Sequence, residues 1–299
     1  MQFSSSFCRN VEGAFPEGAA WIASLPDLLA ECERRWDMTV ADPFPLSFSF
    51  VAPAVTRQGN DVVLKIGVPN PELRSEIAAL RLYGGSAAVR LLDADEDRGF
   101  LLLERLAPGQ MLVTVEDDEE GTRIAARIMR ELWRPLPDNH TFPTVAQWAK
   151  GLQRLRQRFG GGTGPFPPAL VNLAESLFDE LLASSEPAVL VHGDLHHSNI
   201  LSAQRRPWIA IDPKGLAAEP TYEVGALLRN PSPRLWSDVT VQRRRIDVLV
   251  EELNLDRPRV VGWAVAQAVL SAWWGHEDSD SGWEAGCACA QTLRRLMTQ

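Results

Sequence analysis

The segment VHGDLHHSNILSAQRRPWIAIDPKG, residues 191–215, brings together the side chains with the clearest capacity for chemistry. A buried strand is predicted to end at His192, a polar loop carries Asp194 and Asn199, and two apolar runs then bracket a turn before Asp212. A hairpin of this kind would place Asp194, Asn199 and Asp212 together at its open end.

These three polar side chains suit phosphoryl transfer from a nucleotide. A Mg²⁺ ion takes oxygen ligands, and one carboxylate with one amide oxygen can supply two of them while the phosphates supply others. A separate carboxylate must accept or orient the proton of the attacking hydroxyl. We therefore assign Asn199 and Asp212 to the metal and Asp194 to the acceptor hydroxyl.

The histidines of the same segment allow a second interpretation, a transition-metal site. Such a site would need a cysteine or a further carboxylate in register, and the carboxylate and amide of this loop are already accounted for. We expect His192, His196 and His197 to brace the loop through hydrogen bonds.

Lysine is rare in this chain, which makes each lysine informative: of 30 basic residues only three are lysines, at positions 65, 150 and 214. Lys65 lies in the apolar run VVLKIG, where a compact charge could meet the α and β phosphates. Glu76 faces inward from a predicted helix and could hold that lysine, although a strand-edge lysine and a surface glutamate are the plain alternative. Lys214, which follows Asp212 and Pro213, fits a phosphate contact and a structural salt bridge equally well.

The elements around these residues change in type along the chain. Between residues 45 and 105 the runs LSFSFVAPAV, DVVLKIGV, AAVRLLDA and GFLLLERL read as strands around one helix, PNPELRSEIAALRLYGG. After APGQ, residues 107–110, the spacing is mostly helical, interrupted by the short apolar runs AVLVH and PWIAID. We predict a small α/β lobe over residues 1–105, a hinge over 106–111, and a larger, mainly helical lobe over 112–299.

These residues in this order resemble the aminoglycoside phosphotransferase family of the protein-kinase-like fold, and most closely its streptomycin 6-phosphotransferase and hydroxyurea phosphotransferase branch. The resemblance runs from about Pro45 to Pro231 and includes SFSFVAPAV, VVLKIGVPNPEL, EIAALRLYGGSAAVRLL, LLLERLAPG and HGDLHHSNIL. The pattern H-G-D-x-x-x-x-N with a following I-D is specific to that superfamily, and PWIAIDPKGLAAEPTYEVGALLRNP indicates the branch. It implies a bilobal α+β fold, with a small antiparallel-sheet lobe that binds the nucleotide and a helical lobe that carries the catalytic and acceptor-binding residues.

The resemblance also implies a role for each matching residue. Asp194 would be the catalytic base, Asn199 and Asp212 the Mg²⁺ ligands, and Lys65 with Glu76 the pair that contacts phosphate.

At the predicted hinge, the backbone of Glu104 and Leu106 would hydrogen-bond adenine, beneath Leu103. Family members use ATP or GTP, and a leucine in this place does not choose between them. The chain departs from the kinase pattern G-x-G-x-x-G, because VAPAVTRQGND holds the single glycine Gly59. A phosphate-covering loop is still expected before Lys65, with contacts that the sequence does not name.

Acceptor specificity is expected in the helical lobe, where carboxylates follow two tryptophans. These candidates are Trp273, Trp274, Glu277, Asp278 and Asp280. Carboxylates beside aromatic faces suit a guanidinium or ammonium group, such as the guanidinium groups of streptomycin. A solvated acidic turn with a tryptophan in the core explains them equally well. Glu219 and Glu223 could also reach the acceptor, although Glu223 opens a helix where the dipole favours a carboxylate anyway.

The composition limits the partners of the protein. With 39 acidic and 30 basic residues the net charge is −9, which disfavours nucleic acid, and the run Arg243–Arg245 is interpreted as a solvated helix face. No stretch approaches the ~18 apolar residues of a membrane helix. The opening MQFSSSFCRNVEGAF lacks the features of a signal peptide. The spacing of the four cysteines does not indicate a disulfide framework. We expect a cytoplasmic location, with a nucleotide and a small cationic hydroxylated acceptor as partners and no nucleic acid, membrane or protein partner implied.

The leading hypothesis is an ATP- or GTP-dependent kinase that phosphorylates a hydroxyl of an aminoglycoside, with streptomycin as the expected acceptor. One alternative is a kinase of another small hydroxylated metabolite or of hydroxyurea. An alternative of another class is an inactive nucleotide-binding module, against which the presence of base, metal ligands and lysine argues.

Overall fold

The computed structural model describes residues 3–279 and 282–297, apart from the side chains of residues 278 and 279. The chain divides into two compact units, Met1–Ala107 and Pro108–Gln299. None of the helices in the described ranges combines the length and apolar character that a membrane-spanning helix needs.

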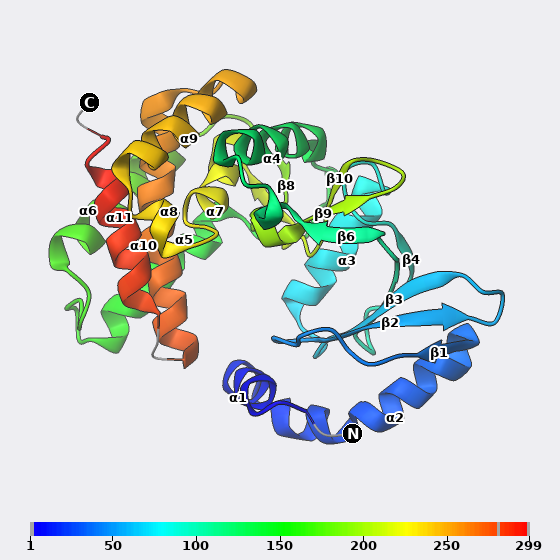
Figure 1. Ribbon diagram of the computed structural model, residues 1–299. Helices are drawn as coiled ribbons and strands as arrows, with labels where there is room; N and C mark the ends of the chain where they lie inside the picture. The colour runs from blue at the N-terminus through cyan, green and yellow to red at the C-terminus, as the bar shows by residue number, and fades with distance from the viewer. Residues whose placement is uncertain (1–2, 280–281, 298–299) are drawn as a thin grey trace. The chain divides into compact units, whose positions relative to one another are not determined.

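The first unit is built on an antiparallel sheet with the strand order β1-β2-β3-β5-β4 (Figure 1). The strands are β1 (Met38–Val40), β2 (Phe50–Thr56), β3 (Asp61–Ile66), β4 (Leu91–Asp95) and β5 (Phe100–Glu104). The four runs expected as strands each overlap one of β2 to β5. The central strand β3 carries Lys65, which pairs with Val51 on one side and Leu101 on the other.

The helix expected between β3 and β4 is α3 (Pro71–Tyr83). The side chain of Asn70 accepts hydrogen bonds from the first backbone N–H groups, and Gly84, at φ +58°, ends the helix in a left-handed conformation. The buried side chains of α3 recur at helical spacing, and they include Leu73, Glu76, Ile77 and Leu80. Glu76 therefore points to the protein interior and not to solvent.

Two helices that the sequence analysis did not predict precede the sheet, α1 (Ser5–Ala14) and α2 (Gly18–Trp36). Their apolar side chains join those of β2, β3 and β5 in one core; this core includes Phe7, Leu25, Cys32, Phe50, Leu64 and Phe100. The sheet is thus covered on this face by the N-terminal helices (blue in Figure 1).

The second unit is mainly helical. Its α-helices are α4 (Asp118–Leu132), α5 (Val145–Arg158), α6 (Pro168–Ala183), α7 (Val224–Leu228), α8 (Pro233–Trp236), α9 (Val239–Leu253), α10 (Arg257–Ser279) and α11 (Trp283–Arg294). The helix α10 packs against α5, α6, α7, α9 and α11 (Figure 1). Apolar side chains such as Val260, Trp263, Val269 and Leu270 are fully buried along it, so α10 forms the core of this unit.

Two small sheets complete the second unit. One has the order β10-β9-β6, from β6 (Pro108–Met111), β9 (Ile200–Ala203) and β10 (Trp208–Ala210). The other has the order β11-β8-β7, from β7 (Arg134–Pro135), β8 (Val189–Val191) and β11 (Leu216–Ala218). The apolar runs at 188–192 and 207–212 contain β8 and β10, as expected, and part of the segment expected as a hinge forms β6.

The run Arg243–Arg245 on α9 is not a solvated face throughout. Arg245 is fully buried, and its Nε lies 2.9 Å from an oxygen of Asp118 at the start of α4. Burial alone would raise the pKa of Asp118, but the hydrogen bonds from Arg245 and Arg244 hold this pKa below its usual value. The expectation failed because α4 packs on α9 and covers the arginine.

Candidate active site

A hairpin brings the three residues of the sequence motif together. The chain leaves β8, passes through Asp194 and the short 3₁₀ helix His197–Asn199, and enters the β9–β10 hairpin, in which Ile200 pairs with Ala210. Ile211 then donates its N–H to the carbonyl of Asn199 at 2.9 Å. Asn199 and the residue after Ile211, Asp212, therefore flank the open end of the hairpin, as predicted.

The side chain of Asn199 links this end of the hairpin to Asp194. Its Nδ2 donates to the backbone carbonyl of Asp194 at 3.0 Å, which leaves Oδ1 as the oxygen that can bind a cation. Asp212 adopts φ +60°, a left-handed conformation that aspartate tolerates better than most residues and that recurs at functional sites. One amide oxygen and one carboxylate match the hard donor set of Mg²⁺, so the residues present fit this ion.

His192 braces the motif, as expected. Its Nδ1 accepts the N–H of Asp194 at 3.3 Å, and its Nε2 donates to the carbonyl of Ile211 at 2.8 Å. Burial lowers the pKa of His192 to about 4, so the ring is neutral at physiological pH. One imidazole thus ties the loop before Asp194 to the strand before Asp212.

The other two histidines differ from each other. His196 accepts the N–H of Ser198 on Nδ1, whereas His197 is buried and neither of its ring nitrogens has a hydrogen-bond partner within the described residues. The expectation of bracing hydrogen bonds is therefore wrong for His197. Within residues 3–279 and 282–297, no group of three or more His, Cys, Asp and Glu side chains could hold a metal ion.

Glu223, a candidate for acceptor contact, lies beneath the loop that carries Asp194 and is only 1% exposed. It accepts the N–H groups of His192 at 2.6 Å and Gly193 at 3.0 Å. Burial raises the pKa of Glu223 to about 7 although these N–H groups favour the ionised form. The structure therefore gives this glutamate the task of holding the backbone next to Asp194.

Glu219, the other glutamate expected near the acceptor, is likewise buried, with 2% of the residue exposed. Its carboxylate pairs with Arg259 at 2.5 Å and accepts from the indole N–H of Trp263. Both carboxylates are occupied by protein donors, which the sequence could not reveal because the donors come from distant elements.

In the first unit, Lys65 and Glu76 form the expected ion pair. The lysine Nζ lies 2.7 Å from both carboxylate oxygens of Glu76, and the two side chains are about nine-tenths buried. The pair is held by β3 and α3, so its position is set by the sheet and the helix packed on it. The role of the pair towards phosphate stays a prediction.

Two neighbouring segments of the first unit were also expected to contact the nucleotide. Leu106 is buried, and the backbone N–H of Glu104 donates to the carbonyl of Arg90 at 3.0 Å. A contact of these two residues with adenine stays a prediction. The segment VAPAVTRQGND forms β2 and a tight turn into β3, in which Gly59 adopts φ +82°. A phosphate-covering loop before Lys65 stays a prediction.

The acceptor candidates on α10 separate into different environments. Trp273 is 3% exposed and packs in the core against Phe159 and Phe166, as the plain alternative supposed. Trp274 is half-buried, and Glu277 forms a two-point ion pair with Arg154, with both distances 2.8 Å. Asp280 and the side chain of Asp278 lie outside the described residues.

Trp148, which the sequence analysis missed, lies beside the catalytic loop. Its ring is 5.3 Å from that of Trp274, edge to face, and its outer edge is 3.3 Å from the point that a β-carbon on Gly193 would occupy. The two indoles thus form an aromatic wall, in which Trp148 lies against Gly193, the residue before Asp194. Trp148 sits in the amphipathic helix α5, where sequence alone cannot distinguish it from a core residue.

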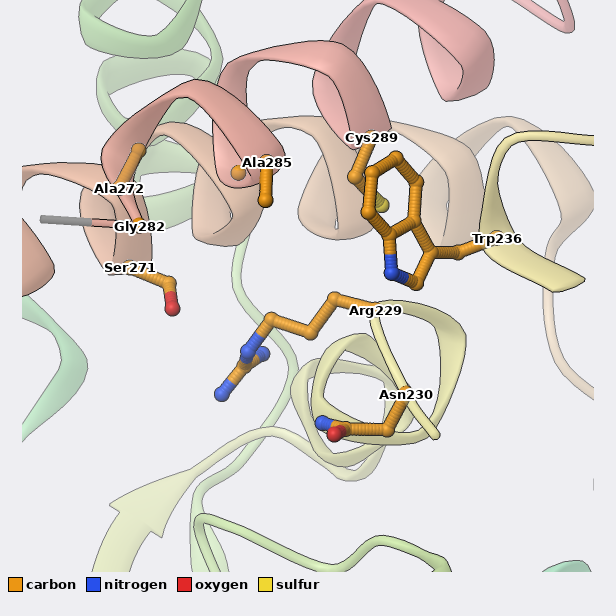
Figure 2. A pocket seen from close by; sticks show the side chains of 9 residues that line it. Arg229, Asn230, Trp236, Ser271, Ala272, Gly282, Ala285 and Cys289 are labelled. Carbon is orange, nitrogen blue, oxygen red and sulfur yellow. The ribbon is translucent and has the colours of Figure 1, made fainter. Parts of the chain in front are cut away.

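Arg229, also missed, contacts the predicted catalytic base. Its Nη2 lies 3.3 Å from Oδ1 of Asp194, and it lines a cavity of about 200 Å³ (Figure 2). Further lining residues are Asn230, Trp236, Ser271, Ala285 and Cys289. The cavity therefore adjoins a side chain that touches Asp194.

Three comparisons with known proteins complete the description of the site. A family model described as aminoglycoside/hydroxyurea antibiotic resistance kinase matches residues 35–279. A streptomycin 6-kinase from Streptomyces glaucescens is 35% identical over 93% of this chain and 92% of its own length. A hydroxyurea phosphotransferase from Kitasatospora aureofaciens is 33% identical over 88% of this chain and 76% of its own length.

Solved structures share the fold at much lower identity. A choline kinase from Streptococcus pneumoniae, 12% identical, covers 92% of this chain and 99% of its own, with a TM-score of 0.62. The predicted protein-kinase-like α+β fold is confirmed by this likeness and by the antiparallel sheet and helices described above.

Proposed function

Because the chain belongs to the aminoglycoside/hydroxyurea antibiotic resistance kinase family, we propose that it transfers the γ-phosphoryl group of ATP to a hydroxyl of streptomycin. The observation that carries this proposal is the convergence of Asp194, Asn199 and Asp212 at the end of one hairpin. The 35% identity to a streptomycin 6-kinase over almost the whole of both chains supports the 6-hydroxyl as the acceptor group.

The catalytic step follows from the geometry of the loop. The carboxylate of Asp194 accepts the proton of the attacking hydroxyl, while Asn199 Oδ1 and the carboxylate of Asp212 would hold Mg²⁺. When bound, that ion neutralises charge on the phosphate oxygens. The loop itself is kept rigid by His192 and Glu223, so the base is positioned before the acceptor arrives.

The nucleotide is held by residues of the first unit in this proposal. Lys65, fixed by Glu76, contacts the phosphates, and the carbonyl of Glu104 with the N–H of Leu106 binds the adenine edge. The assignment of nucleotide binding to the first unit and of catalysis and acceptor binding to the second rests on the family. We propose ATP as the donor, with GTP as the variant to be tested, and the cytoplasm as the compartment that supplies it.

Acceptor recognition is proposed at the aromatic wall of Trp148 and Trp274. A guanidinium group stacks well on an indole face, and such contacts contribute about 0.5–2 kcal/mol. The cavity beside Arg229 suits an uncharged, hydroxylated part of the acceptor, because its wall already carries a cation. The carboxylate of Glu277 is available to the acceptor only if it exchanges its partner Arg154.

A second candidate acceptor is hydroxyurea, which the 33% identity to a hydroxyurea phosphotransferase supports. Both reactions use the same base and the same donor, so the site residues do not discriminate between them. The inactive-module alternative is disfavoured, since the chain carries the residues proposed as base and metal ligands and the Lys65–Glu76 pair.

A panel of acceptors tests the proposal directly. The protein is incubated with Mg²⁺ and either ATP or GTP, together with streptomycin, hydroxyurea or simple sugars, and nucleoside diphosphate release and the phosphorylated product are measured. Phosphorylation of streptomycin at its 6-hydroxyl is expected. Turnover of hydroxyurea or a sugar with no turnover of streptomycin would overturn the choice of acceptor and leave the kinase activity standing.

A further inference from the structure

Arg229, at the end of α7, connects the predicted base to the core of the second unit. Its Nη2 donates to Oδ1 of Asp194 at 3.3 Å, and its Nη1 donates to Oε1 of Gln267 at 3.2 Å. Gln267 is 5% exposed in the middle of α10 and donates its own Nε2 to the carbonyl of Tyr222 at 2.5 Å. The guanidinium of Arg229 is therefore fixed by Gln267 while it binds the carboxylate of Asp194.

This contact makes the two oxygens of Asp194 different. Oδ1 is engaged by Arg229, whereas Nε2 of His196 lies 3.8 Å from Oδ2, beyond hydrogen-bond length. The N–H of Ser198 donates to Nδ1 of His196, so the proton of the neutral ring is on Nε2. In the described part of the chain, Oδ2 is thus the oxygen left to accept a proton from a substrate.

We propose that Arg229 is a positioning residue, which fixes the Asp194 carboxylate so that Oδ2 faces the acceptor hydroxyl. This inference rests on the proposed role of Asp194 as the base. A guanidinium can engage Asp194 and Gln267 at once through two nitrogens of one planar group, and a lysine cannot reproduce that geometry. Rotation of the carboxylate would break the contact, so the orientation of the base is set before catalysis.

The same side chain also forms part of the cavity wall (Figure 2). Ser271 and Ala272 of α10 lie on that wall. The side chain of Arg229 points towards their side of the cavity, away from Trp236 and Cys289. An acceptor group that enters the cavity therefore meets the residue that orients the base. This arrangement couples acceptor placement to the position of Oδ2.

The test compares Arg229→Gln and Arg229→Lys with a matched control, Arg156→Gln. Arg156 in α5 also bridges a carboxylate and an amide, those of Glu175 and Asn172, but it touches no site residue. We measure kcat, the KM values of ATP and acceptor, the Kd of a non-hydrolysable ATP analogue and the thermal midpoint of each variant.

The positioning role predicts a selective loss of turnover. Arg229→Gln is expected to lower kcat on the order of 10–100-fold with the Kd of the analogue unchanged, because misplacement of a catalytic group slows the step without affecting nucleotide binding. Arg229→Lys should recover only part of that loss, and Arg156→Gln should change the thermal midpoint without changing kcat. A folded Arg229→Gln protein with unchanged kcat, or an equal loss of kcat in Arg156→Gln, would overturn the inference.

Asp194→Asn, assayed in parallel, separates this inference from the proposed function. If Asp194→Asn turns over normally, the base assignment fails, and the positioning role fails with it. If Asp194→Asn is inactive while Arg229→Gln is fully active, the base assignment stands and the positioning role alone is refuted. Gln267→Met should lower kcat in the same direction, and the double variant with Arg229→Gln should be no slower than Arg229→Gln alone.

Discussion

Gly193, between the bracing His192 and the proposed base Asp194, is the backbone position on which the loop depends most. It adopts φ +85°, where a side chain is strained, and a β-carbon there would lie 3.2 Å from Cβ of Leu216 and 3.3 Å from both Cβ of Lys214 and the ring of Trp148. Gly193→Ala therefore has two costs in stability. An alanine in the left-handed conformation costs about 1–2 kcal/mol, and the crowding of its β-carbon costs about 1–3 kcal/mol more.

The expected result is a loss of both stability and turnover. The sum of roughly 2–5 kcal/mol corresponds to a fall in Tm of at least about 4 °C for a unit of this size. The N–H of Gly193 donates to Glu223 at 3.0 Å, so relief of the crowding shifts the peptide that leads to Asp194. A displacement near 1 Å costs about 100-fold in rate, and we expect kcat to fall on the order of 10–100-fold.

Gly161→Ala is the control for backbone strain alone. Gly161 lies in the same unit at φ +90°, and an added β-carbon would meet nothing within 4 Å. This variant should lose about 1–2 kcal/mol of stability and keep its kcat. Steady-state kinetics and thermal unfolding of both variants decide the matter: if Gly193→Ala keeps a kcat within about twofold of Gly161→Ala, the account of the loop is wrong.

Two further predictions concern the buried ion pairs. Glu76→Gln removes the negative charge that fixes Lys65. We expect the affinity for an ATP analogue, measured by calorimetry, to fall about tenfold, because this corresponds to the lower end of the range for one lost charge-assisted hydrogen bond. Unchanged affinity would argue against a phosphate contact of Lys65. The second ion pair joins Asp118 and Arg245, and the pKa of Asp118 is lower in the folded state than in the unfolded state. The pairing therefore stabilises the protein fully at pH values above the unfolded-state pKa of about 3.9. This contribution is lost as the pH falls through the folded-state pKa. Asp118→Asn should therefore cost about 3–5 kcal/mol at pH 7, and thermal unfolding at pH 3 should show a smaller difference from the wild type; a difference that does not change with pH would contradict the pairing.

The motif residues were predictable from sequence because their meeting is set by local structure. Asp194, Asn199 and Asp212 lie on one strand–loop–hairpin segment. Hairpin register brings Asn199 and Asp212 together, and the hydrogen bond from Asn199 to the carbonyl of Asp194 joins the third residue to them. Lys65 and Glu76 come from adjacent elements, and the inward face of α3 follows from helical spacing.

The other contacts of the site depend on packing between elements that are far apart in the chain, and such packing cannot be predicted from the patterns of a single sequence. Arg229, at the end of α7, contacts Asp194, 35 positions away in the loop after β8, and its guanidinium is held by Gln267 of α10. In the run Arg243–Arg245, periodicity cannot say that α4 covers Arg245. Glu219 and Glu223 were expected to reach an acceptor, yet the carboxylates of both are bound by donors from distant parts of the chain.

The central claim is that Asp194 is the base of a phosphoryl transfer performed at the end of the β9–β10 hairpin. Its most direct test is the single-turnover rate of phosphoryl transfer from Mg-ATP to streptomycin, measured by rapid quench for the wild type and Asp194→Asn. The account predicts a rate lowered by about 10²–10⁴-fold in the variant, the contribution of a general base, with ATP binding retained. A variant that binds ATP and transfers the phosphoryl group at the wild-type rate would contradict it.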